Sequence, residues 1–354
     1  MSLQNSIYAR LPVFTQHIAV SIYGFYWRRL RFGHGYSKFL EEYITRESYN
    51  SQEWVKWQEK RLSQILKGAL CTPFYSKNWT DDQKKAASAN RLDELPFLEE
   101  EPLRASPESF LREDMQPNRT LAFYTSGSTG TPIRSTWTVP EIRKSIALRE
   151  ARSAMWASVS FDEPRATFSG RMIEPDPERQ TNVYRYNFAE KQVYFSAFHL
   201  KPDTAHLYVE ALKKHKIKWL TGYAVSYYLL AKYILEQKIP TPKINAVITT
   251  SEKLTDPMRK VMEKAFGCKI FEEYSTVENA LFASECEHGH LHVSPDVAII
   301  EILRPDGTPC EPGEVGEVVT TCLMRSYQPL IRFRLGDLAA WDPEPCPCGR
   351  QMPV

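Results

Sequence analysis

The sequence predicts an α/β protein with a helical N-terminal part and a smaller β-rich region near its end. Residues 1–120 carry apolar side chains mostly at helical spacing, and residues 121–290 alternate short apolar strands with amphipathic helices. Residues 291–354 combine short strands with turn signals. Because strands that alternate with helices form βαβ units, we expect layered sheets with covering helices in the middle range.

The helical part is clearest over residues 51–70, where Trp54, Trp57, Leu62 and Leu66 repeat at helical spacing. A Thr-Pro pair at 72–73 predicts the end of this helix. A polar helix is expected at 81–90, and 95–117 reads as proline-punctuated loops. This third of the chain is interpreted as scaffold.

The middle range predicts a regular order of elements. Strands are expected at 121–124, 217–220, 244–249 and 269–271, and helices at 141–156, 204–215, 225–237 and 256–266. Farther on, turn signals at 304–307 and 311–313 bracket apolar runs at 297–303 and 315–321. These runs predict strands and hairpins.

Composition excludes several classes of protein. The net charge of +2 over 354 residues gives no strong field for binding nucleic acid. No stretch reaches the roughly 20 apolar residues of a membrane span. Residues 11–26 are apolar but broken by polar residues, so a packed helix is favoured and a peripheral membrane contact is the alternative. Seven cysteines without a secretory signal argue against disulfides and favour a cytoplasmic location.

A hydroxyl-rich loop follows the first expected strand. Residues 124–132 read YTSGSTGTP. Glycine lets the backbone approach an anion closely, and hydroxyl and amide groups donate to phosphate oxygens. The run lacks the Gly-Lys-Ser/Thr ending of a Walker loop, and a plain flexible turn is the alternative. The candidate phosphate-binding residues are Thr125, Ser126, Gly127, Ser128, Thr129 and Gly130.

This loop resembles the phosphate-binding signature of the acyl-adenylate-forming superfamily, which includes acyl-CoA ligases and peptide-synthetase adenylation domains. Two later segments resemble the other signatures of that family: 271–278 (FEEYSTVE) and 332–337 (RFRLGD). Four more segments look like the phenylacetate–CoA-ligase-like branch, and within it the relatives found in capsular polysaccharide biosynthesis: 168–171, 194–200, 220–223 and 346–350. The resemblance covers about residues 45–354.

The resemblance implies a reaction in which a carboxylate and ATP give acyl-AMP and pyrophosphate. Glu278 would be catalytic by holding Mg²⁺ on the phosphates, and Asp337 would accept hydrogen bonds from both ribose hydroxyls. Tyr274 would stack on adenine or border the acid pocket. Ser251 and Glu252 would line the adenine pocket, with a helix N-cap as the alternative. For Glu278 the alternative is a charge at a helix start, for Asp337 a Gly-Asp turn, and for Tyr274 a core aromatic.

Two positions depart from the family pattern. Val277 stands where a hydroxyl residue is usual, and Ser275, beside the nucleotide, stands where glycine is usual. The departures imply either an adjusted geometry or altered activity. Arg134 lies near the position of a lysine in many relatives and would partly replace it.

The acid pocket implied by the resemblance lies near Tyr223, His199 and Tyr274. His199 would be catalytic if its imidazole meets the substrate carboxylate, and a packed core histidine is the alternative. The many aromatic residues point only to a planar or apolar acid.

Cysteine and histidine spacing predicts a metal site. Cys286 and His292 are close in sequence, and Cys346 and Cys348 form a distant Cys-x-Cys pair. A Cys₃His set suits tetrahedral structural Zn²⁺. His288 and His290 are the competing ligands, but they lie in a polar turn with a glycine, so His292 is preferred. Unrelated thiols are the alternative.

The function expected from these signs is ATP-dependent activation of a carboxylic acid, followed by transfer to CoA. One alternative is an amine, hydroxyl or sugar acceptor, and another is a non-catalytic nucleotide-binding protein. The resemblance also implies a C-terminal lid domain, and the sequence ends at Val354 before its hinge would begin. We therefore expect either a truncated chain or a natural form without the lid.

Overall fold

The structure is a computed structural model that describes residues 8, 11–125, 132–171, 173–174 and 181–354. The helices of these residues are α2 (Val13–Arg31), α3 (Tyr36–Arg46), α4 (Ser51–Ala69), α5 (Pro73–Asn78), α6 (Asp81–Ser88), α7 (Glu100–Ala105), α8 (Val139–Arg149), α9 (Ala205–Lys214), α10 (Ala224–Gln237) and α11 (Asp256–Phe266). A π-helical turn, Glu150–Ala154, continues α8.

The strands are β1 (Thr120–Tyr124), β2 (Arg134–Thr138), β3 (Arg165–Phe168), β4 (Tyr184–Asn187), β5 (Gln192–Phe195), β6 (Trp219–Tyr223), β7 (Ala246–Thr250), β8 (Lys269–Ser275), β9 (Phe282–Glu285), β10 (Leu291–Val293), β11 (Ala298–Leu303), β12 (Gly316–Cys322) and β13 (Phe333–Ala339). They form a hairpin of β1 and β2, a large sheet in the order β10-β9-β8-β7-β6-β3-β5-β4, and a small sheet in the order β11-β12-β13.

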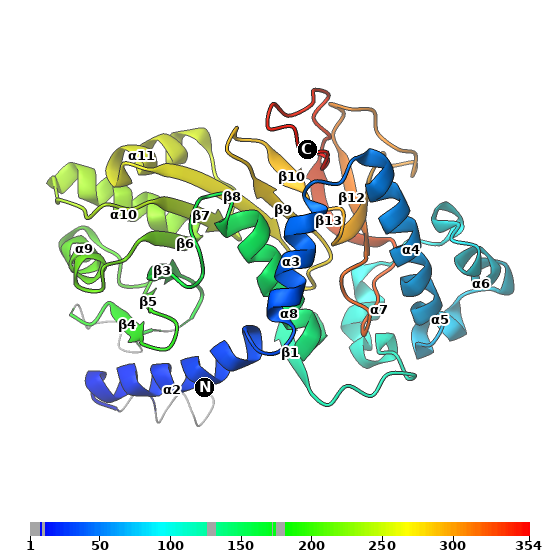
Figure 1. Cartoon of the computed structure of the whole chain (residues 1–354), viewed down its shortest axis with the longest axis horizontal. Coiled ribbons are helices and arrows are strands. Elements are labelled where there is room, and N and C mark those ends of the chain that lie inside the picture. Colours follow the sequence, from blue (N-terminus) through cyan, green and yellow to red (C-terminus); the bar gives the residue numbers. More distant parts are fainter. Residues whose placement is uncertain (1–7, 9–10, 126–131, 172, 175–180) are drawn as a thin grey trace. The chain divides into compact units, whose positions relative to one another are not determined.

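The chain divides into two compact units. The first comprises Met1–His34, Leu148–Glu273 and Glu285–Gly289, and the second comprises Gly35–Ala147, Tyr274–Ser284 and His290–Val354. The first therefore holds the parallel strands and the helices α9, α10 and α11, and the second holds the helices α3–α7 and the small sheet (Figure 1).

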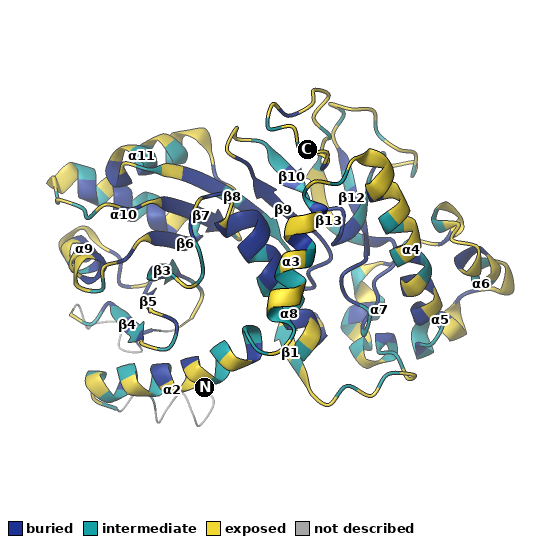
Figure 2. Cartoon of the chain, in the orientation of Figure 1, coloured by how far each residue is buried: buried dark blue, intermediate teal, exposed yellow. Residues whose placement is uncertain are grey.

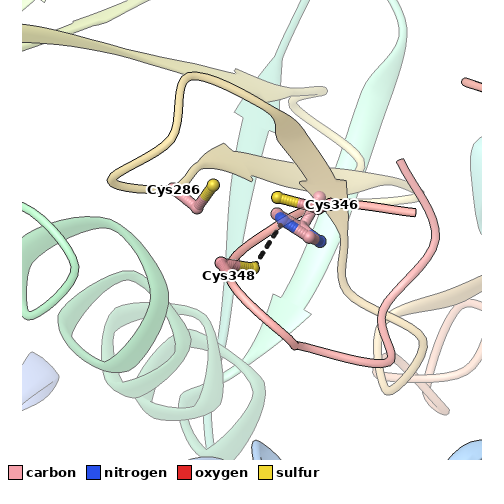
Figure 3. Close-up of side chains that lie close together, drawn as sticks. Cys286, Cys346 and Cys348 are labelled. Carbon is pink, nitrogen blue, oxygen red and sulfur yellow. Dashed lines mark hydrogen bonds between the residues drawn. The ribbon is translucent and has the colours of Figure 1, made fainter. Parts of the chain in front are cut away.

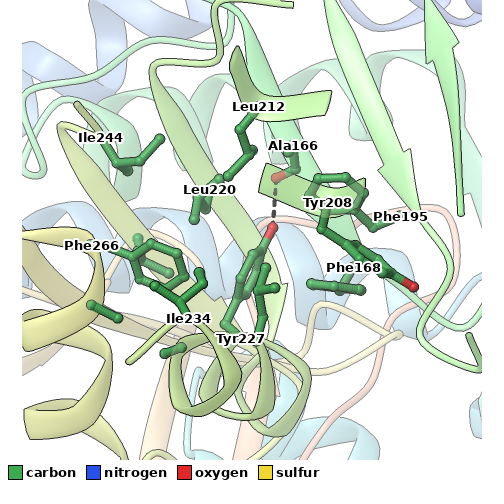
Figure 4. Close-up of a cluster of buried hydrophobic side chains, with 14 of the residues drawn as sticks. Ala166, Phe168, Phe195, Tyr208, Leu212, Leu220, Tyr227, Ile234, Ile244 and Phe266 are labelled. Atoms are coloured by element: carbon green, nitrogen blue, oxygen red, sulfur yellow. Dashed lines mark hydrogen bonds between the residues drawn. The ribbon is translucent and has the colours of Figure 1, made fainter. Parts of the chain in front are cut away.

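Parallel pairing organises the first unit. Strands β5, β3, β6, β7 and β8 pair in parallel, and β4 joins the edge antiparallel to β5. Successive residues of a strand face opposite sides, so Leu220 joins a core with α9–α11, whereas Trp219 joins a second core with Ala154. Figure 4 shows the larger core, in which the hydroxyl of Tyr227 donates to the carbonyl of Ala166 over 2.8 Å. Both faces of the sheet are thus covered, as parallel sheets require.

Helix α2 covers the edge strand β4 through polar contacts. The amide of Tyr186 donates to Nδ1 of His17 over 2.8 Å, and the amide of Phe188 donates to Oγ of Ser21 over 3.0 Å. These bonds satisfy backbone groups that an open sheet edge would leave free. The opposite face of α2 is apolar and exposed, with Phe14 73% and Phe25 63% accessible (Figure 2). The region is a packed helix, and its exposed face leaves the peripheral-contact alternative open.

The second unit has its own core. Helices α4–α7 pack with residues of β12, β13 and the segment between them, including Leu66, Phe110, Leu323 and Phe333. Helix α4 begins with a capping box in which Asn50 and Glu53 bond each other's backbone amides. Strands β1 and β2 pair antiparallel from Thr120↔Thr138 to Tyr124↔Arg134. This hairpin brings the two ends of the hydroxyl-rich loop together.

The predicted fold class is confirmed: a large mixed sheet with covering helices, a small β-rich region and a helical N-terminal part. Helix α11 has the predicted bounds. The strand expected at 217–220 lies instead at Trp219–Tyr223, because a left-handed residue at Lys216 ends the preceding turn. Strands β3, β4 and β5 were not predicted. Within the described residues, no helix is long and apolar enough to span a membrane.

Candidate functional site

The base of the hydroxyl-rich loop lies at the end of the β1–β2 hairpin where the chain passes from β1 to β2. Thr125 and Ile133 face each other there: the amide of Thr125 donates to the carbonyl of Ile133 over 3.2 Å, and the amide of Ile133 donates to Oγ1 of Thr125 over 2.9 Å. The rest of the predicted phosphate-binding set lies outside the described residues: Ser126, Gly127, Ser128, Thr129 and Gly130. The structure therefore gives the loop a closed base on two paired strands.

Tyr274 and Asp337, the candidates for adenine and ribose, touch each other. The hydroxyl of Tyr274, near the end of β8, donates to Oδ2 of Asp337 in β13 over 2.5 Å. Burial raises the pKa of Tyr274, and the hydrogen bond and charge of Asp337 raise it further. Asp337 is exposed and follows Gly336, whose φ of +74° places the carboxylate on an irregular strand. The Gly-Asp pair therefore lies in a bulged strand and not in the turn that was the alternative interpretation, and the carboxylate is exposed to solvent.

Glu278 is a buried carboxylate, with 5% of the residue accessible. Burial raises its pKa, whereas hydrogen bonding with its own backbone and with Thr276 lowers it. It lies in a turn after β8, so the alternative of a charge at a helix start does not apply. Within the described part of the chain its carboxylate forms no ion pair. A buried acid without a basic partner suits a bound hard cation, because Mg²⁺ is held by few protein carboxylates.

Arg325 organises this turn, although no local pattern in the sequence indicates this role. Its guanidinium is fully buried and donates to the carbonyl of Glu278 and to Oγ of Ser135, each over 2.7 Å. It also donates to the carbonyl of Thr136 over 2.5 Å and stacks on Trp137, with Cζ 4.5 Å from the ring centre. Arg325 thereby connects strand β2, which follows the hydroxyl-rich loop, to the backbone of Glu278. A single arginine in a short connection has no periodicity, so only spatial contact could reveal it.

The two family departures lie beside these residues. Ser275 ends β8 and is half-buried, and Val277 is 38% accessible in the same turn as Glu278. Arg134 is the first residue of β2 and is exposed. The exposure of Val277 leaves room at this position, but it supplies no hydroxyl donor.

Tyr223, an acid-pocket candidate in the first unit, ends β6 and caps α10. A Cβ added to Gly170 would lie 2.8 Å from its hydroxyl, so glycine there leaves the space that the phenol occupies. The preceding Gly222 has φ of +126°, and an added Cβ would lie 1.9 Å from the carbonyl oxygen of Phe168. Two glycines thus fix where the side chain of Tyr223 lies.

His199 is buried, with 3% of the residue accessible. Its Nδ1 lies 2.7 Å from Oγ of Ser196, and its carbonyl accepts a 2.7 Å hydrogen bond from Thr204. These contacts match the packed core histidine that was the alternative interpretation. A role toward substrate would have to use Nε2.

Ser251 and Glu252 follow β7 in an exposed loop. Ser251 has a left-handed backbone with φ of +68°. Oε2 of Glu252 accepts a 2.9 Å hydrogen bond from the amide of Val225 in the first turn of α10. The N-cap alternative concerned α11, the helix that follows in sequence, but the contact of Glu252 is with α10. Negative charge at a helix start is stabilising, so Glu252 has a structural role in the first unit.

The four predicted metal ligands come together. One ligand atom each from Cys286, His292, Cys346 and Cys348 lies within 4.8 Å of the others (Figure 3). Tetrahedral Zn²⁺ with bonds of about 2.0–2.3 Å needs ligand atoms roughly 3.5 Å apart, so a small contraction would close the site. Cys286 lies in the turn of the β9–β10 hairpin, and the other two thiols lie in the C-terminal segment. The cluster is compatible with a zinc site.

Hydrogen bonds around the cluster support that fit. Nδ1 of His292 donates to the carbonyl of Met352 over 3.0 Å, which directs Nε2, 3.3 Å from Sγ of Cys348, toward the thiols. The amide of Arg350 donates to the sulfur of Cys348 over 3.5 Å. Burial raises the pKa of Cys348, but the hydrogen bonds from Arg350 and Cys346, together with the charge of Arg350, lower it overall.

The two competing histidines lie outside the cluster. The backbone amide of His288 donates to Sγ of Cys286 over 3.3 Å, but its side chain is exposed. Nδ1 of His290 lies 3.3 Å from a carboxylate oxygen of Asp342. Among the described residues, His292 is therefore the histidine of the cluster.

The fold and these motifs are similar to those of the adenylate-forming, acyl-CoA ligase superfamily. No family model matches the chain. It is 26% identical over 340 residues to Protein CapK of Staphylococcus aureus, a match that covers 94% of this chain and 72% of CapK. It is 33% identical over 105 residues to the phenylacetate-coenzyme A ligase of Thermus thermophilus, which covers 28% of this chain and 24% of that enzyme.

Solved structures agree on the fold. An open conformation of 2-hydroxyisobutyryl-CoA ligase, in complex with 2-HIB-AMP and CoA, superposes with a TM-score of 0.65 at 20% identity. The match covers 87% of this chain and 74% of that one. The same ligase in the thioesterification state gives a TM-score of 0.66 at 21% identity, over 87% and 68% of the two chains.

Proposed function

We propose that this protein activates a carboxylic acid with ATP, forming an acyl-AMP and releasing pyrophosphate. The observation that carries the proposal is the contact between Tyr274 and Asp337, 2.5 Å long, a few residues from the buried carboxylate of Glu278. Residues 63 apart in sequence converge as a nucleotide site needs: an aromatic ring and an exposed carboxylate, with a buried acid close by in sequence.

Each group has a distinct task in this proposal. Asp337, exposed, accepts hydrogen bonds from the ribose hydroxyls, and the hydroxyl of Tyr274 holds its carboxylate in place while the ring borders the base. Ser275 and the pair Ser251 and Glu252 border the nucleotide. Thr125 anchors the loop whose hydroxyls and amides meet the phosphates. Glu278 holds Mg²⁺, which offsets phosphate charge.

The chemical difficulty is the approach of two anions, a carboxylate and the α-phosphate. Catalysis therefore consists mainly of placing them in line and spreading negative charge over fixed donors and the cation. Tyr223 and His199 are the candidates for the acid side, and a small carboxylic acid, aromatic or apolar, is the expected class of substrate. In view of the contacts of His199 with Ser196, its part in catalysis would be to position the pocket wall or to use Nε2.

CoA is the first candidate acceptor, because a local match of 33% identity over 105 residues is to a phenylacetate-coenzyme A ligase. An amine, hydroxyl or sugar acceptor is the second candidate, because the match that covers 94% of the chain is to CapK, whose name specifies no CoA chemistry. A non-catalytic nucleotide-binding protein is the third, and Val277 is the observation that favours it. We further propose that Zn²⁺ is held by Cys286, His292, Cys346 and Cys348, in a cytoplasmic protein with reduced thiols.

An ATP–pyrophosphate exchange assay over aryl, fatty and amino acids tests the activity, with nucleotide binding measured in parallel. We expect exchange with at least one acid, and a loss of about 100-fold in Glu278→Gln and Asp337→Asn, as removal of a preorganised charge usually causes. Asp306→Asn, at an exposed turn of the same unit, is the matched control and should keep wild-type exchange. Absence of exchange with every acid would refute the proposal, and ATP binding without exchange would favour the non-catalytic nucleotide-binding protein.

The acceptor is tested after an acid has been found. Thioester formation with CoA supports the first candidate. Accumulation of acyl-AMP without CoA consumption, followed by product formation with an amine or sugar, supports the second.

A further inference from the structure

A small cavity in the second unit gathers three cations away from the nucleotide residues. It has a volume of about 170 Å³ and lies between helices α3, α4 and α8. Its lining includes Arg46, Arg61 and Lys144, with Glu42 and Asp296 as the acids. The charged groups that line it therefore carry a net charge of +1, from three cations and two anions.

One of the cations is already neutralised. Nε of Arg46 donates to Oδ2 of Asp296 over 2.9 Å, and the side chain of Asp296 is fully buried. Glu42 adds a longer contact of 3.7 Å from its Oε2 to Nη1 of Arg46. The guanidinium also lies over the rings of Tyr43 and Trp57, at 4.7 Å and 5.2 Å from their centres. Both acids of the cavity are thus engaged by Arg46.

Arg61 and Lys144 have no such partner. Arg61 donates to the carbonyl of Leu323 over 2.7 Å and to the side-chain amide oxygen of Gln64 over 2.7 Å, and both acceptors are neutral. Nζ of Lys144 lies over the ring of Phe39 at 5.4 Å. Among the residues that the structure describes, neither cation forms an ion pair within 4.0 Å. Burial lowers the pKa of Lys144, the charges of Arg61 and Arg46 lower it further, and Glu141 and Glu42 raise it in part.

We propose that this cavity binds a small phosphate-class oxyanion between Lys144 and Arg61. Such an ion supplies the negative charge that these two cations lack, and guanidinium and ammonium donors match its oxygens. The volume is well below the roughly 300–1,000 Å³ of ordinary ligand pockets, so a single phosphoryl group fits the cavity better than a nucleotide does. The ring of Phe39 and the ion pair of Arg46 hold the walls in place before the anion enters.

The proposal is independent of the adenylating activity. The anion site includes none of the residues of the proposed nucleotide site, and phosphate binding there requires neither Mg²⁺ nor ATP. Isothermal titration of the whole protein with inorganic phosphate, at constant ionic strength set by sodium chloride, is the direct experiment. We expect saturable binding of one phosphate per chain.

Substitutions locate the site. Lys144→Met and Arg61→Met should each weaken phosphate binding at least tenfold, whereas Lys144→Arg should retain it. Lys60→Met removes an exposed lysine from the same helix as Arg61 and should bind as the wild type does. Glu278→Gln should also leave phosphate binding unchanged, which separates this site from the proposed nucleotide site.

Thermal unfolding without phosphate shows whether each variant is folded before its binding is interpreted. If Arg61→Met is unstable, because its bonds to Leu323 and Gln64 are lost, the test rests on Lys144→Met, whose ammonium forms no hydrogen bond with the described residues. No saturable phosphate binding by the wild type, or equal binding by wild type and a folded Lys144→Met, overturns the proposal.

Discussion

Replacing Arg325 by methionine should destabilise the second unit more than any surface substitution. The guanidinium makes four hydrogen bonds: to Oγ of Ser135, to the carbonyls of Thr136 and Glu278, and to Oε1 of Gln328. Methionine fills part of the volume but leaves these buried acceptors without that donor. A lost hydrogen bond that leaves a buried acceptor unsatisfied costs about 1–3 kcal/mol.

The expected total is about 3–5 kcal/mol, less than four times the single cost because acceptors relax and some find other partners. Against a total stability of about 5–15 kcal/mol, this is a large fraction. Arg325→Lys is the matched variant: it keeps the charge but has one nitrogen, which cannot replace both Nη1, bonded to Ser135 and Glu278, and Nη2, bonded to Thr136 and Gln328. It should lie between wild type and Arg325→Met.

Urea unfolding followed by tryptophan fluorescence measures the effect, since Trp137 stacks on the guanidinium at 4.5 Å. If Glu278 holds Mg²⁺, a folded Arg325→Lys should also need more Mg²⁺ for half-maximal pyrophosphate exchange, a change that a purely structural arginine would not cause. A loss of less than about 1 kcal/mol in Arg325→Met would refute the reasoning, because it would mean that these acceptors need no buried donor.

Three further predictions follow from backbone, metal and proton contacts. Gly222→Ala should cost at least about 2 kcal/mol in thermal unfolding, because its positive φ strains alanine and an added Cβ would lie 1.9 Å from the carbonyl oxygen of Phe168, whereas Gly267→Ala, with open space around it, should cost about 1 kcal/mol. Metal analysis should find one zinc per chain, lost on chelation and in Cys348→Ser but kept in Cys268→Ser, which lies outside the cluster; well under one zinc in the wild type contradicts the site. Burial, then the nearby cations, lowers the pKa of His215 to about 4, below its unfolded value near 6.5. The folded state therefore binds fewer protons, stability falls as pH drops from about 6.5 toward 4, and His215→Phe should flatten that fall; an unchanged pH profile in this variant would count against it.

Sequence patterns located elements where local signals were strong. Helix α11 was predicted at its observed bounds because a proline lies in its first turn, a left-handed Gly267 ends it, and apolar residues repeat between them. Strands β3, β4 and β5 were missed because each is only four residues long and two contain buried arginines. Arg185 is buried in β4 through an ion pair of 2.9 Å with Glu174. In a sequence, a buried charged residue cannot be distinguished from a surface residue, and only its ion-pair partner in the structure explains why it is buried.

Candidate site residues divide in the same way. The Cys₃His set and the pair Tyr274 and Asp337 were predicted by spacing and by family resemblance, and the structure places the members of each set in contact. Glu252 was assigned to adenine, with a cap of the next helix as the alternative, but the structure shows it bonded to the start of α10. The reason is geometric: parallel strands bring the loop after β7 beside the loop after β6, which is not apparent from the order of the chain.

The amino-acid sequence was enough to predict the class of fold, the order of most elements and the chemical types at the candidate nucleotide and metal sites. Those features depend on periodicity, turn residues and short motifs, which are local properties of the chain. The tertiary structure alone decided that Arg325 ties β2 to the turn of Glu278, that His199 is bonded to Ser196 within the core, and that Lys144 and Arg61 share a cavity without an acid of their own. These facts depend on which distant side chains meet, and the free energy of a buried charge is set by those neighbours rather than by its place in the sequence.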